Sequence, residues 1–316
     1  MTTTLSPQAA DAPIEPEPKS KHQMSARARS ERKLGWMLCA PAVIVMLLVT
    51  GYPIAYAVWL SLQRYDLRFP NDNEFIGLDN YSAVLGNSLW WQDLFHTMII
   101  MVLSVSIELV LGFLLAWVMH RAIFGRAIVR SSSLVPYGII TVVAAFSWRF
   151  AFDTNTGFVN TLTNTDTAWF STPWSSYFVI IATEVWKTTP FMALLLLAGF
   201  TLVPDDVVNA ARVDGATNMQ RLRRIIIPLM KPAILVAVLF RALDAFRIFD
   251  TVYIQTRGAQ QTETVSILAY NTLITRVNLG LGSAISVLIF VGVLIIAFVF
   301  VKGFGTNLAQ QRGEAP

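Results

Sequence analysis

Long apolar stretches alternate with shorter polar ones along most of this 316-residue chain. A helix needs about 20 mostly apolar residues to cross a lipid bilayer. Stretches of about that length or longer run from Leu34 to Leu62, Leu94 to His120, Ile128 to Phe150, Ser176 to Phe200, Ile225 to Phe249 and Leu281 to Val301. The pattern therefore predicts an all-α integral membrane protein with about six transmembrane helices, within a membrane domain of residues 34–303.

Composition agrees with that pattern. Hydrophobic residues make up 54% of the chain, charged residues only 14%, and the mean hydropathy is +0.54. Soluble domains carry about 25% charged residues. Residues 1–33 are polar and proline-containing, which predicts a disordered tail, and 304–316 form a second tail. The apolar run after Lys33 is longer than the core of a signal peptide, so we interpret it as an uncleaved first membrane helix.

Basic residues outside the expected helices are unevenly distributed, which predicts the orientation. Most of them fall in the first tail, the second and fourth connections and the C-terminal end, at Lys19, Lys21, Arg27, Arg29, Arg32, Lys33, Arg121, Arg126, Arg130, Arg212, Arg221, Arg223, Arg224, Lys231, Lys302 and Arg312. The other segments hold only Arg64, Arg68, Arg149, Arg257 and Arg276. Because cytoplasmic loops are enriched in Lys and Arg, both termini are expected in the cytoplasm.

The fourth connection, residues 204–228, has a pattern of its own. Pro204 followed by Asp205 suits the first turn of a helix, where proline and acidic side chains are favoured. Gly215 then interrupts a narrow apolar stripe, and Pro228 is expected to close the segment. We expect two short helices hinged at Gly215. Such a unit could dock into a groove of a cytoplasmic partner or lie as an amphipathic helix on the lipid surface, and the pattern alone leaves both open.

The spacing within this segment resembles the EAA loop of ABC importer permeases. That pattern reads E-A-A, three residues, G, nine residues, then I-x-L-P, and it is matched here at Ala210, Ala211, Gly215, Ile225 and Pro228. Two positions depart from the pattern: Asn209 replaces the usual glutamate, and Ile227 replaces the usual leucine. Further segments resemble sugar permeases of the maltose and glycerol-phosphate importer type: Phe75 to Tyr81, Leu134 to Pro136, Trp148 to Phe150, Gly157 to Asn160, and Phe249-Asp250 with Tyr253 and Thr256. The glycine-rich run that usually follows is replaced by Thr256 to Gln260.

This resemblance implies a passive permease subunit rather than an enzyme. It implies import of a sugar, with trehalose-importing members of the family as the best match. The residues implied to couple to an ATPase are Asn209, Ala210, Ala211, Asp214, Gly215 and Ala216. The implied partners are a second permease, a dimer of nucleotide-binding ATPase subunits and an external sugar-binding lipoprotein, in a bacterial inner membrane. ATP and magnesium would bind the ATPase subunits, since this chain contains no G-x-x-x-x-G-K-[ST] motif.

Ionisable and aromatic side chains in the expected helices four and five are candidates for the substrate pathway. Charged groups inside a membrane are costly and therefore suggest function. The candidates are Glu184, Lys187, Arg241, Asp244, Phe246, Arg247, Phe249, Asp250 and Tyr253. Sugar hydroxyls bond to carboxylates and guanidinium groups, and sugar C–H faces pack on rings such as the expected stripe of Phe246, Phe249 and Tyr253.

Plainer interpretations of the same residues stay open. Three pairs of opposite charge are each three residues apart, so the two members of a pair could simply neutralise each other. They are Glu184 with Lys187, Arg241 with Asp244, and Arg247 with Asp250. Glu108 has no local partner and is expected to pair across helices. An ion-coupled secondary transporter using Glu108 or Asp244 is the alternative function. An integral membrane enzyme ranks last, because no catalytic constellation is evident and no Cys/His pattern has metal-ligand spacing.

Overall fold

The computed structural model describes residues 26–121 and 126–313, and the chain divides into two units, residues 1–54 and 55–316. The first unit contains α1 (Ala26–Met46), the π-helical turn η1 (Leu47–Gly51) and the start of α2 (Tyr52–Ser61). Helix α1 begins inside the segment 1–33 that was expected to be disordered, so that expectation is wrong for residues 26–33. The reason is local, since alanine, arginine, glutamate and lysine are strong helix formers. Residues 1–25 lie outside the described part.

The second unit is built on four long helices. They are α4 (Ser88–Arg121), α8 (Pro173–Phe200), α11 (Ile227–Ala245) and α14 (Leu279–Gly313). Among the described residues, five helices are long and apolar enough to cross a membrane, and a bent pair gives a sixth. The expected all-α membrane fold is therefore confirmed. Helix α14 continues to Gly313, so the expected domain boundary at residue 303 does not coincide with a helix end, and residues 314–316 are not described.

The third expected span is not one helix. It consists of α5 (Arg126–Gly138) and α6 (Thr141–Ala151), with an angle of 87° between the apolar part of α5 and α6. A proline such as Pro136 ordinarily bends a helix. Instead the chain leaves helical geometry two residues after Gly138, where Ile140 has φ −57° and ψ 132°. Proline and glycine together weaken the helix at one place, so a sharp break replaces a bend.

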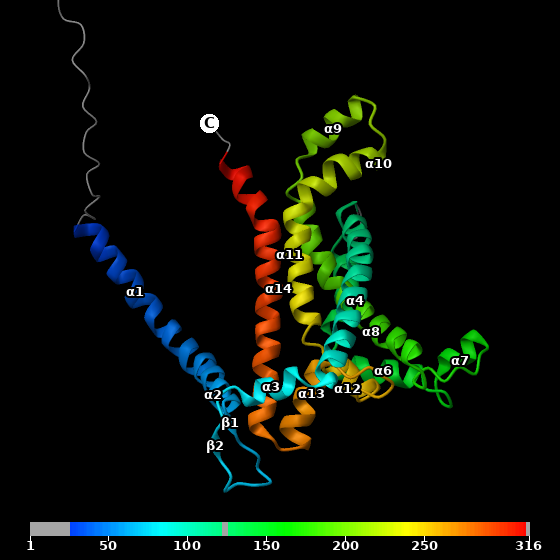
Figure 1. The fold of residues 1–316 in the computed structure, drawn as a ribbon. Helices are drawn as coiled ribbons and strands as arrows, with labels where there is room; N and C mark the ends of the chain where they lie inside the picture. Colours follow the sequence, from blue (N-terminus) through cyan, green and yellow to red (C-terminus); the bar gives the residue numbers. More distant parts are fainter. Residues whose placement is uncertain (1–25, 122–125, 314–316) are drawn as a thin grey trace, which may run out of the picture. The chain divides into compact units, whose positions relative to one another are not determined.

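Short elements lie at the two ends of the long helices (Figure 1). One end carries α9 (Asp205–Val213), α10 (Asn218–Arg221) and the π turn η2 (Leu222–Ile226). The other end carries β1 (Gln63–Arg64), β2 (Glu74–Phe75), α3 (Asp79–Leu85), α7 (Phe158–Thr163), α12 (Asp250–Gln255), α13 (Val265–Tyr270) and η3 (Asn271–Thr275). The two strands pair antiparallel, with Gln63 opposite Phe75. In the connection between them, the Arg68 guanidinium bonds to Asp66 and lowers the pKa of that carboxyl group.

Two of the three π turns in the described residues, η1 and η2, stand directly before a helix whose second residue is proline. Helix α2 begins Tyr52-Pro53 after η1, and α11 begins Ile227-Pro228 after η2. A proline inside a regular α-helix removes one hydrogen bond and clashes with the preceding turn. A wider π turn accommodates the ring, so the helix continues. Pro228 therefore does not close the segment 204–228 as expected; α10, η2 and α11 form one continuous helix, Asn218–Ala245.

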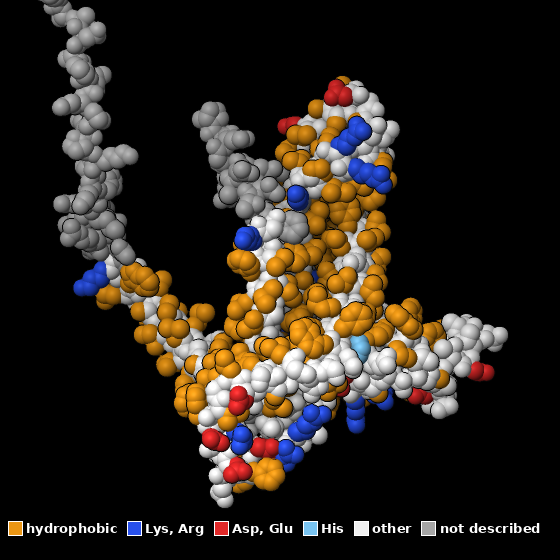
Figure 2. Space-filling view, viewed as in Figure 1, with side chains coloured by type: hydrophobic (Ala, Val, Ile, Leu, Met, Phe, Trp, Pro, Cys, Tyr) orange, Lys and Arg blue, Asp and Glu red, His pale blue; other side chains and the backbone are white. Residues whose placement is uncertain are grey.

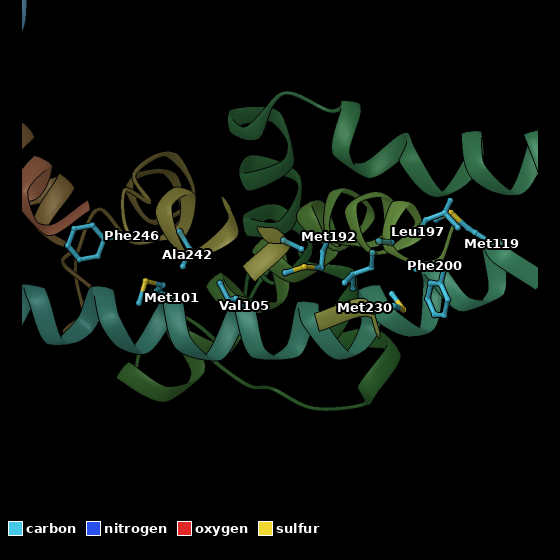
Figure 3. Close-up of a cluster of buried hydrophobic side chains, with 14 residues drawn as sticks. Met101, Val105, Met119, Met192, Leu197, Phe200, Met230, Ala242 and Phe246 are labelled. Carbon is cyan, nitrogen blue, oxygen red and sulfur yellow. The ribbon is translucent and has the colours of Figure 1, made fainter. Parts of the chain in front are cut away.

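The largest core cluster lies where α4, α8 and α11 pack together. Met101, Val105 and Met119 of α4 lie close to side chains of α8 and α11, including Met192, Phe200 and Met230 (Figure 3). Glycine allows close approach at these crossings: a Cβ on Gly199 of α8 would lie 2.6 Å from Ala233 Cβ of α11. Small residues at such positions let membrane helices pack tightly.

Hydrophobic side chains also cover the outside of the long helices. In the second unit, Figure 2 shows them along the sides of the helices, with Lys, Arg, Asp and Glu gathered toward the two ends. Exposed apolar residues include Val110 and Leu114 of α4 and Ile295 and Phe298 of α14. An apolar belt between two charged ends is the surface expected of a protein that spans a bilayer.

Candidate functional site

The segment 204–228 forms the hinge predicted from its sequence, and we call it the hinged segment. Helices α9 and α10 are joined at Gly215, whose φ is +82°. Glycine, which has no Cβ, adopts a positive φ more readily than any other residue. Helix α10 begins with a capping box. The backbone N–H of Gln220 donates to Thr217 Oγ1, and the backbone N–H of Thr217 donates to the side-chain Oε1 of Gln220. Pro204 occupies the N-cap position of α9, one residue earlier than expected, so Asp205 is the first helical residue.

The hinged segment presents an open surface. No residue of α9 is buried, and Val213 is 88% exposed. Of the expected coupling residues, four are exposed and two are half-buried; the exposed ones are Asn209, Ala210, Asp214 and Gly215, and the half-buried ones are Ala211 and Ala216. The described residues of this chain therefore leave the segment free to meet another surface.

A polar pocket of about 150 Å³ lies between α8, the end of α11, α12 and the start of α6, and we call it the pathway pocket. It brings together six of the nine residues expected along the substrate pathway: Glu184, Lys187, Asp244, Arg247, Phe249 and Asp250. Sequence reasoning missed its other polar lining residues, Thr141, Thr188 and Thr251. Isolated threonines in apolar segments carry no signal that separates a pocket lining from ordinary packing.

A second pocket of about 500 Å³ shares Arg247 and Phe249 with the pathway pocket. We call it the aromatic pocket, because the rings of Phe249 and Tyr270 line it, and both pack against the ring of Tyr253 beside it. The Phe249 ring centroid lies 5.1 Å from that of Tyr253 and 5.2 Å from that of Tyr270. Tyr270 was not predicted, since it stands on α13, a separate helix outside the expected spans. Two adjoining pockets, one polar and one aromatic, provide both kinds of surface that a sugar requires.

The expected aromatic stripe of Phe246, Phe249 and Tyr253 is wrong. Phe246 is buried and packs against α14, where a Cβ on Gly292 would lie 2.8 Å from its ring. The physical reason is that α11 ends at Ala245, and Phe249 has φ −135° and ψ −63° before α12 begins. Helical spacing therefore does not relate Phe246 to the two residues that follow the break.

Arg241 is the centre of a buried ionic cluster. Its Nε lies 2.5 Å from Glu108 Oε2 and its Nη2 lies 2.8 Å from Glu108 Oε1, so α11 and α4 are joined by a bidentate pair. Arg241 Nη1 lies 2.5 Å from Asp244 Oδ2, which confirms that local pair, and Nη2 lies 3.7 Å from Glu184 Oε2. Glu108 therefore pairs across helices, as expected. The Arg241 side chain is 1% exposed, whereas that of Asp244 is 67% exposed.

The two other expected local pairs are wrong. Among the described residues, Glu184 forms no ion pair with Lys187, and Arg247 forms none with Asp250. Glu184 faces inward and accepts a hydrogen bond from Thr251, while the Lys187 ammonium lies over the Tyr137 ring on α5. Arg247 Nε donates to the Leu243 carbonyl oxygen. The break after Ala245 removes the helical spacing on which the Arg247 pair depended.

Comparison with known families gives one match over most of the chain. Residues 80–309 match the family described as binding-protein-dependent transport system inner membrane component. The trehalose transport system permease protein SugA of Mycobacterium tuberculosis is 54% identical over 285 residues, covering 90% of this chain and 92% of that protein. The trehalose/maltose transport system permease protein MalF of Thermococcus litoralis is 37% identical, covering 86% of this chain and 94% of that protein.

Solved structures show the same fold. A bacterial alginate ABC transporter, crystallised with an alginate pentasaccharide-bound periplasmic protein, contains a chain that matches with a TM-score of 0.74. The match covers 88% of this chain and 96% of the other, at 19% sequence identity. At that identity the match supports the fold and carries no information on the cargo.

Proposed function

Because this chain belongs to the family of binding-protein-dependent transport system inner membrane components, we propose that it carries trehalose through the membrane as the permease subunit of an ABC importer. The chain is a sugar permease of an ABC system, and its named relatives are transport subunits rather than enzymes. The observation that carries the proposal is the pathway pocket, where carboxylates, two cationic side chains and an aromatic ring meet inside a bundle of membrane helices. The 54% identity to a trehalose permease supports the choice of sugar.

The expected pathway residues divide into two groups in this proposal. Glu184, Asp244 and Asp250 accept hydrogen bonds from sugar hydroxyls, and Lys187 and Arg247 donate to them. The aromatic cluster, Phe249 with Tyr253 and Tyr270, packs against C–H faces of the sugar. Phe246 and Arg241 lie outside this lining and act through packing and through the ionic cluster.

The hinged segment is proposed as the surface that engages the ATPase. Its contact residues would be Asn209, Ala210, Ala211, Asp214, Gly215 and Ala216. Two short helices with small side chains at the turn fit a groove, as an amphipathic helix does in many partner complexes. Asn209 makes this contact without the negative charge of the usual glutamate, so shape and neutral hydrogen bonds supply the docking energy.

The family implies three kinds of partner: another permease, an ATPase and a substrate-binding protein. We propose that the second permease is homologous, that two ATPase subunits form a dimer, and that the binding protein is a lipoprotein on the outer side. ATP and magnesium are proposed to bind the ATPase subunits. The chain is a multi-pass protein of the inner membrane, and the distribution of Lys and Arg supports a cytoplasmic location for both termini.

Ion-coupled transport is less well supported by the geometry. A proton or sodium site at Glu108 or Asp244 would need a carboxylate available to the ion. Both carboxylates bond to Arg241, and Glu108 uses both of its oxygens. A bound guanidinium already supplies the positive charge that a coupling ion would bring.

The test is to co-express the chain with its candidate permease, ATPase and binding-protein partners. The complex would be purified through a tag on this chain and assayed for ATP hydrolysis in lipid, with and without trehalose-loaded binding protein. Gly215→Val is compared with Gly215→Asn, because asparagine tolerates positive φ and valine does not. We expect Gly215→Val to lower trehalose-stimulated hydrolysis or to release the ATPase, and Gly215→Asn to do so much less. Sugar movement by the chain alone in response to an ion gradient would contradict the proposal.

A further inference from the structure

The helix Asn218–Ala245 connects the hinged segment to the pathway pocket. It has 28 residues, which corresponds to about 42 Å at 1.5 Å per residue. Its first turn follows Gly215 and Thr217 at one end of the bundle. Arg241 stands in its last turns, one turn before Asp244 and the pathway pocket. A displacement of either end is therefore transmitted along a single helix.

Arg241 fixes the pocket end of this helix to α4. The guanidinium and the Glu108 carboxylate meet through two hydrogen bonds, and both side chains are fully buried. Bidentate pairs of this kind have a defined geometry, unlike a single point contact. Because Glu108 does not line the pathway pocket, substrate does not reach this pair directly.

Arg241 also faces two carboxylates that do line the pocket. Nη1 bonds to Asp244, and Nη2 lies 3.7 Å from Glu184. Glu184 in turn accepts a hydrogen bond from Thr251, the second residue of α12. One guanidinium thus shares its donors between a buried anchor on α4 and two acidic groups that substrate can contact. A ligand that bonds to the same oxygens, Asp244 Oδ2 and Glu184 Oε2, competes with Arg241 for them.

We propose that Glu108 and Arg241 form a positioning clamp that holds the helix Asn218–Ala245 in its resting place until sugar enters the pathway pocket. Sugar hydroxyls that bond to Glu184 weaken the contact of Arg241 with α8, whereas Asp244 stands on the same helix as Arg241 and links it to no neighbouring helix. The ionic contact of Arg241 with α4 through Glu108 remains while its contact with Glu184 of α8 is weakened, so the helix can shift relative to α8 and move the hinged segment at its other end. The clamp is a positioning device and touches no substrate. This inference rests on the proposed function, because it assumes that sugar passes through the pathway pocket.

The experiment uses the complete complex in lipid, with ATP hydrolysis measured without sugar and with trehalose-loaded binding protein. Glu108→Gln removes the charge and keeps the shape. Asp93→Asn is the matched control, since Asp93 is a carboxylate on the same helix, is also buried (1% exposed, against 0% for Glu108), and faces His96 rather than Arg241. We expect Glu108→Gln to raise sugar-independent hydrolysis about fivefold or more, the lower limit of typical coupling between sites, and to reduce the stimulation by sugar. Asp93→Asn should leave both rates near those of the wild type.

A merely structural role for the pair gives a different result. In that case Glu108→Gln lowers the yield or thermal stability of the complex, and both rates fall in proportion; this outcome overturns the clamp. If the Glu108→Gln complex does not assemble, Glu108→Asp keeps the charge but shortens its reach, and it must show raised sugar-independent hydrolysis. Failure of the wild-type complex to respond to trehalose would instead contradict the proposed function, and this result is distinguishable from a failure of the clamp because it concerns the wild type.

Discussion

A single arginine accounts for much of the polar chemistry inside the bundle. Arg241 has five N–H donors and meets Glu108, Asp244 and Glu184 from three helices, α4, α11 and α8. A buried charge is tolerated only when it is paired and hydrogen-bonded, so these residues fix one another's positions. The pairing across helices was predictable in kind from the isolated Glu108. Its partner was not, because residues 108 and 241 are far apart in sequence.

Two phenylalanines three positions apart are expected to respond differently to the same substitution. Phe249→Leu removes a ring from the aromatic cluster beside both pockets, and pairs of aromatic rings contribute about 0.5–1.5 kcal/mol. We therefore expect sugar uptake by the assembled complex to fall about two- to tenfold, measured with labelled trehalose in proteoliposomes.

Phe246→Leu is the control for that measurement. Its ring is buried against α14 and away from the pockets, so the variant should lower the thermal stability of the complex with little effect on uptake per folded complex. Equal losses of uptake in the two variants would contradict the separate placement of Phe246 and Phe249.

At the scale of elements, apolar length predicts the spans well and their interruptions poorly. The expected limits of helices two, four and six fall within α4, α8 and α14. The break between α5 and α6, and the break after Ala245, were both missed. Pro136 indicates a weak point in one case, but the sequence around Ala245 contains neither proline nor glycine. That break is stabilised by tertiary contacts, such as the bond from Thr251 to Glu184, which local sequence does not encode.

Gly199, at the crossing of α8 and α11, allows a prediction about the stability of the helix packing. Gly199→Ala would bring its new Cβ to 2.6 Å from Ala233 Cβ, a short side chain that cannot swing away. We expect a loss of about 1–3 kcal/mol in stability, as for other overpacked cores. Differential scanning fluorimetry of the complex measures the change.

Gly303→Ala on α14 is the matched control, because nothing lies within 4 Å of the Cβ that it adds. It should leave the melting temperature unchanged or slightly raised, since alanine is the better helix former. If the two variants melt at the same temperature, the helices are less tightly packed at Gly199 than the structure indicates.

At the scale of the whole molecule, the orientation in the membrane is the property to be tested. The chain has one cysteine, Cys39, so Cys39→Ser gives a background without thiols. Single cysteines would then replace Val213 in the hinged segment or Asp72 between β1 and β2, both of which are exposed. Because the basic residues predict that the hinged segment is cytoplasmic, a membrane-impermeant maleimide added to intact cells should label position 72 and not position 213. Labelling of position 213 but not of position 72 would show the opposite orientation and contradict the prediction.

The buried pair between Glu108 and Arg241 also constrains how the protein is made. The two residues are 133 positions apart, so at about 5–20 residues per second Arg241 leaves the ribosome roughly 7 to 27 s after Glu108. Throughout that interval α4 has entered, or is entering, the bilayer with a carboxyl group that has no arginine to meet. Water, lipid headgroups or the insertion machinery must solvate the Glu108 carboxyl group until α11 has been inserted. The long helices therefore cannot settle into their final packing one by one during synthesis, and the bundle closes only when its fifth span has been delivered.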